Sequence, residues 1–124
     1  MQTINTPDAP EAIGPYAQAV ETGGMIYCSG QLPVNPANGK IEVAGAAEQT
    51  MRVLLNLRSV LEAAGSGLDK VLKTTVYLTD IGDFPAVNKV YGEMFAGHTP
   101  ARATVQVARL PKSSKVEIDA IAVK

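Results

Sequence analysis

Hydrophobic and polar residues alternate in several short stretches of this chain, which is typical of β-strands with one buried face. The alternation predicts strands over residues 17–21 and 25–29, joined by a turn at Gly23-Gly24. It predicts a third strand over residues 71–78, which are rich in β-branched side chains. One side of that strand is expected to carry Leu72, Thr74, Val76 and Leu78.

Two other stretches repeat their hydrophobic residues every three or four positions, which indicates amphipathic helices. The first helix is predicted from about residue 43 to residue 64, with Gly65 as its C-terminal cap. The second follows Asp83 as its N-terminal cap and ends near Gly97. The apolar stripe of the first is predicted to contain Ala47, Met51, Leu54, Leu57, Leu61 and Ala64. The stripe of the second is predicted to contain Phe84, Val87, Tyr91, Met94 and Phe95.

Two final strands are predicted over residues 102–108 and 115–123, separated by the short connection 110–114. So short a connection favours antiparallel neighbours. The element order ββ-α-β-α-ββ then predicts an α+β fold in which one sheet carries two helices on one face. A length of 124 residues fits a single domain, residues 1–124.

The last predicted strand is apolar on both sides, because Ile121 and Val123 lie opposite a second row of apolar residues. Two helices cover only one face of a sheet, so the other apolar face needs a different cover. We therefore expect a homo-oligomer in which copies of the chain bury this face together. The second row consists of Val116, Ile118, Ala120 and Ala122.

Charge and composition exclude several classes of protein. Eleven Lys and Arg oppose twelve Asp and Glu, which excludes a strongly basic nucleic-acid-binding domain. One cysteine, Cys28, and one histidine, His98, cannot build a zinc site rich in these ligands. Cys28 is expected to be a buried, inert thiol.

No segment is apolar enough to span a bilayer and no signal peptide is visible, so we expect a cytoplasmic protein without a membrane partner.

The most informative candidate chemistry lies in the last two strands. Arg102, Thr104 and Gln106 alternate onto one face of the first. Glu117 and Asp119 alternate onto one face of the second. In a tight antiparallel pairing the two sets would share a face. An Arg binds a carboxylate with two parallel hydrogen bonds, and a nearby Glu accepts a proton from water. The pattern suggests a pocket for a small carboxylate that water attacks at the neighbouring carbon. The alternative is that the Arg and Glu side chains form an exposed cross-strand ion pair, which would stabilise the fold by under ~1 kcal/mol.

Several specific motifs follow one another between about Pro7 and Val123. They are the segments Ala12–Val20, Ser29–Val34, Lys73–Leu78, Asp83-Phe84 with Val87-Asn88, Pro100–Arg102, Val107–Lys112 and Val116–Ile118. In this order they resemble the RidA/YjgF family, the reactive-intermediate (enamine/imine) deaminases, which is also known by the term L-PSP. Several separate motifs in the right order make the resemblance highly specific.

The resemblance implies a chorismate-mutase-like α+β fold of the YjgF/L-PSP type that assembles as a homotrimer, with active-site clefts between neighbouring subunits. It also implies an enzyme, a 2-iminobutanoate/2-iminopropanoate deaminase. Such an enzyme hydrolyses 2-aminoacrylate and related 2-imino acids to 2-oxo acids and ammonia. No cofactor and no metal take part in the family reaction, and the expected partner is a small 2-imino or 2-oxo acid.

The same resemblance implies roles for individual residues. Arg102 matches the family arginine that clamps the substrate carboxylate, and Glu117 matches the acid that positions or activates the water. Gly30 and the backbone of Thr104 match positions that contact the bound acid. Many bacterial members carry a cysteine where this chain has Thr104. The remaining matched cleft positions are Tyr16, Phe84 and Asn88.

Two alternative functions follow from the same residues. The family has also carried the description of an endoribonuclease that inhibits translation, and the basic loop with Arg109, Lys112 and Lys115 would then contact RNA. A net charge of −1 and the lack of a stacking platform argue against it. The other alternative is a non-catalytic trimer that binds a small carboxylate, which would need Arg102 but not Glu117.

Overall fold

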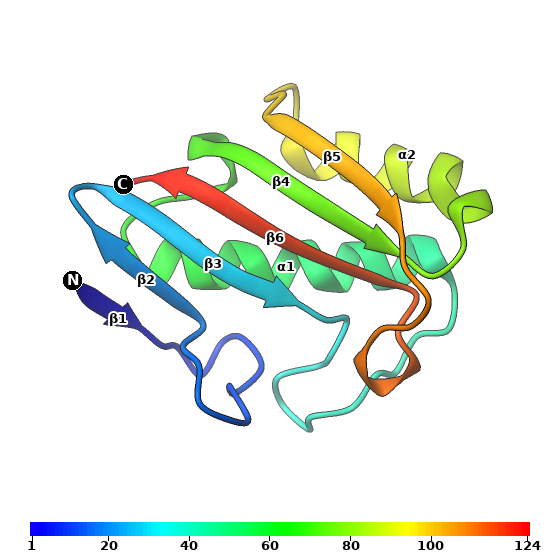
Figure 1. The fold of residues 1–124 in the computed structure, drawn as a ribbon, viewed down its shortest axis with the longest axis horizontal. Helices are drawn as coiled ribbons and strands as arrows, with labels where there is room; N and C mark the ends of the chain where they lie inside the picture. The colour runs from blue at the N-terminus through cyan, green and yellow to red at the C-terminus, as the bar shows by residue number, and fades with distance from the viewer.

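One six-stranded sheet and two α-helices make up the computed structural model, which describes residues 1–124 (Figure 1). The strands are β1 Gln2–Ile4, β2 Ala19–Thr22, β3 Met25–Gln31, β4 Val71–Leu78, β5 Ala101–Gln106 and β6 Val116–Val123. The helices are α1 Ala46–Ala63 and α2 Phe84–Phe95. Both helices lie behind the sheet in Figure 1, on the same face. The predicted α+β fold, one mixed sheet with two helices on one face, is confirmed.

The strand order is β1-β2-β3-β6-β4-β5, and every pair is antiparallel except β4 with β5. β4, α2 and β5 form a βαβ unit, in which a helix joins two parallel neighbours. The predicted antiparallel pairing of the last two strands is therefore wrong, because β4 lies between them. Their connection crosses the end of β4. There, Val107 N–H donates to the Leu78 carbonyl and Thr79 N–H donates to the Lys115 carbonyl.

The core fills the space between the sheet and the helices. Along β6, every second side chain is buried and the intervening ones are half-buried, as the predicted alternation requires. The buried row is the predicted one, from Val116 to Ala122. The largest fully buried side chains of the core include Ile26, Leu54, Leu57, Leu61, Leu78 and Ile118. All of these core residues form one cluster, which supports the prediction of a single domain, although that stays a prediction.

Helix α1 departs from its prediction in two ways. It begins at Ala46 rather than near residue 43, and its predicted stripe is wrong at Met51, which is 48% exposed, and at Ala47, which is only half-buried. Its buried face instead includes the polar side chains of Thr50 and Asn56. Both are hydrogen-bonded to backbone carbonyls, which makes their burial favourable and hides them from a pattern based on hydrophobicity.

Local irregularities explain two further differences. A register shift between Val71 and Lys73 turns Val71 into the core and leaves Leu72 47% exposed, so the predicted side of Leu72 is wrong. Asp83 occupies the N-cap position of α2, but its side chain makes no capping hydrogen bond. The three-residue strand β1 is too short to show an alternation and is absent from the prediction.

The face of the sheet away from the helices is open, and it faces the viewer in Figure 1. On this face Tyr27 is 45% exposed and Val105 is 42% exposed, while Ile121 and Val123 are half-buried. This is the second apolar face that the sequence predicts. Its burial by other copies of the chain stays a prediction. No helix is both long enough and apolar enough to cross a membrane.

Candidate functional site

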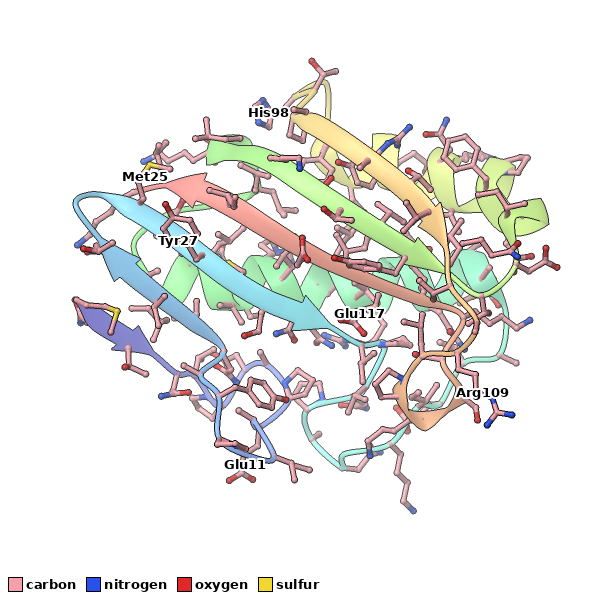
Figure 2. All side chains as sticks on the ribbon, in the orientation of Figure 1. Glu11, Met25, Tyr27, His98, Arg109 and Glu117 are labelled. Atoms are coloured by element: carbon pink, nitrogen blue, oxygen red, sulfur yellow. The ribbon has the colours of Figure 1, made fainter.

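A cavity of about 830 Å³ lies where the end of β3 and the start of β6 meet the surrounding loops. Three of the predicted site residues line it: Tyr16, Gly30 and Glu117. Figure 2 shows Glu117 on the open side of the sheet, beside the arrowhead of β3. We call these three residues and their cavity the Glu117 half-site.

Within this half-site the Glu117 carboxylate packs directly against the backbone of Gly30. A methyl group on Gly30 would lie 2.8 Å from Cδ of Glu117, too close for a real side chain. Glycine therefore leaves the room that the carboxylate occupies. Burial raises the pKa of Glu117, and the negative charge of Asp119 raises it further. A raised pKa makes Glu117 a stronger proton acceptor than an exposed carboxylate.

Arg102 lies on the edge strand β5 and points toward α2. Its Nη1 donates to Asn88 Oδ1 at 2.8 Å. Its Cζ lies 4.9 Å from the ring centre of Tyr91 and 5.3 Å from that of Phe84. These contacts hold the planar guanidinium in place by one hydrogen bond and two cation–π interactions. We call this group of four residues the Arg102 half-site.

The guanidinium has no carboxylate partner, because the only ion pair of the chain joins Lys124 and Glu21. An Arg carries several N–H donors, and only one side-chain acceptor is engaged here. The remaining donors are exposed and match the two oxygens of a small carboxylate.

Tyr91 belongs to this half-site, although its spacing predicts only a place in the apolar stripe of the helix. Its hydroxyl lies 2.7 Å from Thr74 Oγ1, and burial raises its pKa. Phe84, Asn88 and Tyr91 follow one another at steps of four and three residues along α2, so they share one face of the helix. That spacing is the sequence signal that could have identified Tyr91 as a residue of the site.

The two half-sites lie on opposite faces of the sheet. Arg102 is in register with Thr74, which is buried on the helix-covered side. Glu117 is in register with Tyr77, three positions further along the same strand. Because side chains alternate between faces, these two positions of β4 point in opposite directions. The prediction that Arg102 and Glu117 share a face is therefore wrong within one chain.

The other candidate residues are distributed as follows. Thr104 lies on the Arg102 side of β5, half-buried and in register with Val76. Cys28 is buried as predicted, and burial together with Asp119 raises its pKa to about 12, so the thiol stays protonated. His98 Nε2 lies 2.6 Å from the Val71 carbonyl oxygen. No group of three His, Cys, Asp or Glu side chains is close enough to hold a metal ion.

Comparison with known proteins identifies the family. Residues 6–124 match the family model described as Endoribonuclease L-PSP, and a crystal structure of the Escherichia coli YjgF gene product superposes with a TM-score of 0.96. The chain belongs to the RidA/YjgF family. The YjgF structure is 48% identical to this chain and covers 100% of it and 99% of its own length. A crystal structure of Escherichia coli TdcF with bound serine gives a TM-score of 0.96 at 45% identity, covering 100% and 99%.

A curated relative in the same family carries a functional name. The Escherichia coli 2-iminobutanoate/2-iminopropanoate deaminase is 48% identical over 126 residues, which cover 99% of this chain and 98% of the relative. The YjgF/L-PSP fold expected from the sequence motifs is confirmed.

Proposed function

We propose that this protein is a deaminase that hydrolyses 2-iminobutanoate, 2-iminopropanoate and the enamine 2-aminoacrylate to 2-oxo acids and ammonia. The observation that carries the proposal is the chemistry of the two half-sites. One holds a guanidinium with free donors, which suits a substrate carboxylate, and the other holds a half-buried carboxylate, which suits a water molecule. The names of the relatives support the same activity.

We further propose that the complete site forms between two copies in a homotrimer. Arg102 and Glu117 lie on opposite faces of the sheet, so neither reaches the other within one chain. The apolar open face with Tyr27 and Val105 supports an assembly in which copies bury it together. The Arg102 half-site of one copy then faces the Glu117 half-site of its neighbour, and residues 1–124 of each copy act as a single domain.

In the proposed reaction, Arg102 binds the substrate carboxylate and fixes the neighbouring C2 beside a water on Glu117. Glu117 accepts a proton as the water oxygen bonds to C2, and the imine nitrogen gains a proton as the C=N double bond becomes single. The proton on the imine nitrogen comes from solvent. Glu117 then passes its proton to the amino group, the C–N bond breaks to release ammonia, and the hydroxyl proton leaves to solvent as the C=O bond forms at C2. The enamine 2-aminoacrylate enters this sequence after it takes a proton at C3 and becomes 2-iminopropanoate. The reaction consumes only water and releases ammonia. A positioned general base contributes typically ~10²–10⁴-fold, and the fixed orientation of the substrate adds to it.

Subunit complementation tests both the activity and the shared site. Arg102→Ala removes one half-site and Glu117→Ala removes the other, so each variant alone is expected to lose at least ~100-fold in rate. When the two are mixed as equal amounts of unfolded chain and refolded together, about one quarter of the interfaces pair an intact Arg102 with an intact Glu117. The mixture should therefore recover about one quarter of the wild-type rate.

The measurement follows the loss of 2-aminoacrylate generated in the cuvette by a serine dehydratase. Arg58→Ala serves as the control, because Arg58 is an exposed arginine of α1 outside both half-sites. A mixture as inactive as its parents, with mixed trimers confirmed by native mass spectrometry, would contradict the shared site. A folded wild type that does not accelerate imine loss would contradict the deaminase activity, and binding of a 2-oxo acid through Arg102 would then favour the carboxylate-binding alternative.

RNA cleavage, which the description of the family model suggests, is measured on the same preparation. We expect none above background. Arg109, Lys112 and Lys115 are exposed, but the one histidine of the chain lies against the Val71 carbonyl and is unavailable as a general base beside them. RNA cleavage that persists in Arg102→Ala, with no deaminase activity in the wild type, would favour the endoribonuclease.

A further inference from the structure

A second carboxylate, Asp119, lies on the same face of β6 as Glu117 and two residues further along the strand. It is half-buried on the open face of the sheet and has no Lys or Arg partner in the chain. Its hydrogen-bond partner is a neutral phenol, because Tyr77 Oη donates to Asp119 Oδ2 at 2.9 Å. A carboxylate placed on an apolar face without a cation is costly, so packing alone does not account for it.

The position of Tyr77 couples the two carboxylates. Tyr77 is in register with Glu117, whereas Asp119 is in register with Thr75. The phenol of Tyr77 therefore starts opposite Glu117 and reaches diagonally along the sheet to Asp119. This hydrogen bond raises the pKa of Tyr77, so the phenol keeps the proton that it donates. The hydrogen bond thereby fixes the Asp119 carboxylate in place beside Glu117.

We propose that Asp119, held by Tyr77, is a positioning residue whose fixed negative charge keeps Glu117 a strong enough base to take a proton from water. The inference rests on the proposed deaminase function and deepens it. Two like charges on neighbouring carboxylates make the second ionisation less favourable, and the effect is larger where water is partly excluded. In agreement with this geometry, Asp119 is the charged group that raises the pKa of Glu117, after burial itself.

The other ionisable groups around Glu117 and Asp119 do not neutralise the charges of these two carboxylates. None of them forms an ion pair with Glu117 or Asp119. Glu11 and Lys112 line the cavity of the Glu117 half-site and carry opposite charges. The ionisable groups on the same face of the neighbouring strands are Lys73 and Tyr77 of β4 and Tyr27 of β3, and Lys115 directly precedes β6. Glu11, Tyr16 and Lys112 line the cavity. Cys28 is affected by the charge of Asp119 but is buried in the core on the other face of the sheet.

The test is the pH dependence of kcat/KM for 2-aminoacrylate, corrected for spontaneous decay. Asp119→Asn removes the charge at almost constant volume. The acid limb, which reports the loss of activity as Glu117 is protonated, should move to lower pH by about half a unit or more. Asp119→Glu keeps the charge and should leave the limb near its wild-type position. Tyr77→Phe removes the hydroxyl that donates to Asp119, so the carboxylate is held less firmly beside Glu117. The acid limb should then also move to lower pH, by less than in Asp119→Asn. A purely structural role would lower the rate at every pH without moving the limb.

The outcomes separate this inference from the function on which it rests. An unmoved acid limb in a folded, active Asp119→Asn variant overturns the inference and leaves the deaminase proposal standing. A wild type without activity overturns the deaminase proposal. In that case, NMR titration of the labelled Glu117 carboxyl in the wild type and in Asp119→Asn decides the inference: a lower titration midpoint in the variant supports the coupling, and equal midpoints overturn it.

Discussion

Arg102 and Glu117 have in common that each lacks the oppositely charged partner that a strand residue of its type usually has. The Arg102 guanidinium is bound by an amide and two aromatic rings, and the Glu117 carboxylate rests on the backbone of Gly30. Because the two charges lie on opposite faces of the sheet, they cannot neutralise each other within one chain. Both remain available to a ligand, and this availability follows from the strand register.

Gly30→Ala tests whether the placement of Glu117 matters for the reaction. The added methyl group collides with the Glu117 carboxylate and must displace it. A displacement of about 1 Å in a reacting group costs on the order of 100-fold in rate, so we expect a loss of that size in imine hydrolysis. Thermal unfolding of the variant, measured alongside, should show that it is still folded.

Gly92→Ala is the matched control for this substitution. Gly92 lies in α2, and an added methyl group there meets nothing within 4 Å. Since alanine is a better helix former than glycine by about 1 kcal/mol, the control should be slightly more stable than the wild type and equally active. A Gly30→Ala variant that hydrolyses imines at the wild-type rate would show that the reaction does not depend on the observed position of Glu117.

At the scale of the elements, buried amide side chains hold the loops that form the Glu117 half-site. Gln18, just before β2, donates to carbonyls of the N-terminal loop and accepts from Thr6 N–H. Gln49 of α1 donates to the Val43 carbonyl and accepts from Lys115 N–H. Asn56 of α1 donates to the carbonyls of residues 32 and 34 after β3. Irregular segments leave backbone groups without strand or helix partners, and these amides supply the missing partners.

Asn56→Leu should lower the free energy of unfolding by about 2–4 kcal/mol. Asn56 is fully buried, and both of its donors bond to carbonyls that would lose their partners. Urea denaturation followed by circular dichroism measures the change. Ser59→Ala, which removes a half-exposed hydroxyl from the same helix, should change the stability by no more than about 0.5 kcal/mol. Equal losses in both variants would contradict a special role for the Asn56 amide.

At the scale of the whole molecule, the sheet has a helix layer on one face and nothing on the other (Figure 1). Tyr27 lies on this open face, as Figure 2 shows, and Ile121 of β6 is in register with it. Val105 lies on the same face, on the edge strand β5. An apolar face of this kind is unfavourable in water and is normally covered. The same cover would bring the two half-sites together, so assembly and activity are linked in our proposal.

Tyr27→Lys should therefore abolish both the trimer and the activity, because it places a charge on the face that copies are proposed to bury. Met51→Lys is the matched control. Met51 is exposed to nearly the same extent, 48% against 45% for Tyr27, but it lies on α1 in the helix layer. Light scattering after size exclusion gives the mass of each. A trimer that survives Tyr27→Lys, or is lost in Met51→Lys, would contradict the proposed interface.

Most elements were predictable because their signals are local. The alternation over residues 71–78 and the turn at Gly23-Gly24 specify β4 and the β2–β3 hairpin from a few neighbouring residues. Buried Thr50 and Asn56 were not predictable, because their partners are backbone carbonyls and those of Asn56 lie in a loop far away in sequence. The site residues were matched through motifs, and their roles stay predictions.

By itself, the sequence determined the order of most of the strands and both helices, the two residue types needed for the chemistry, and the existence of an apolar face that two helices leave uncovered. Only the tertiary structure decided that β4 separates β5 from β6 and that the registers of both strands on β4 turn Arg102 and Glu117 to opposite faces. The physical reason is that periodicity is a property of neighbouring residues, whereas strand pairing is chosen by contacts across the whole chain. A shift of one residue in that pairing moves a side chain to the other face.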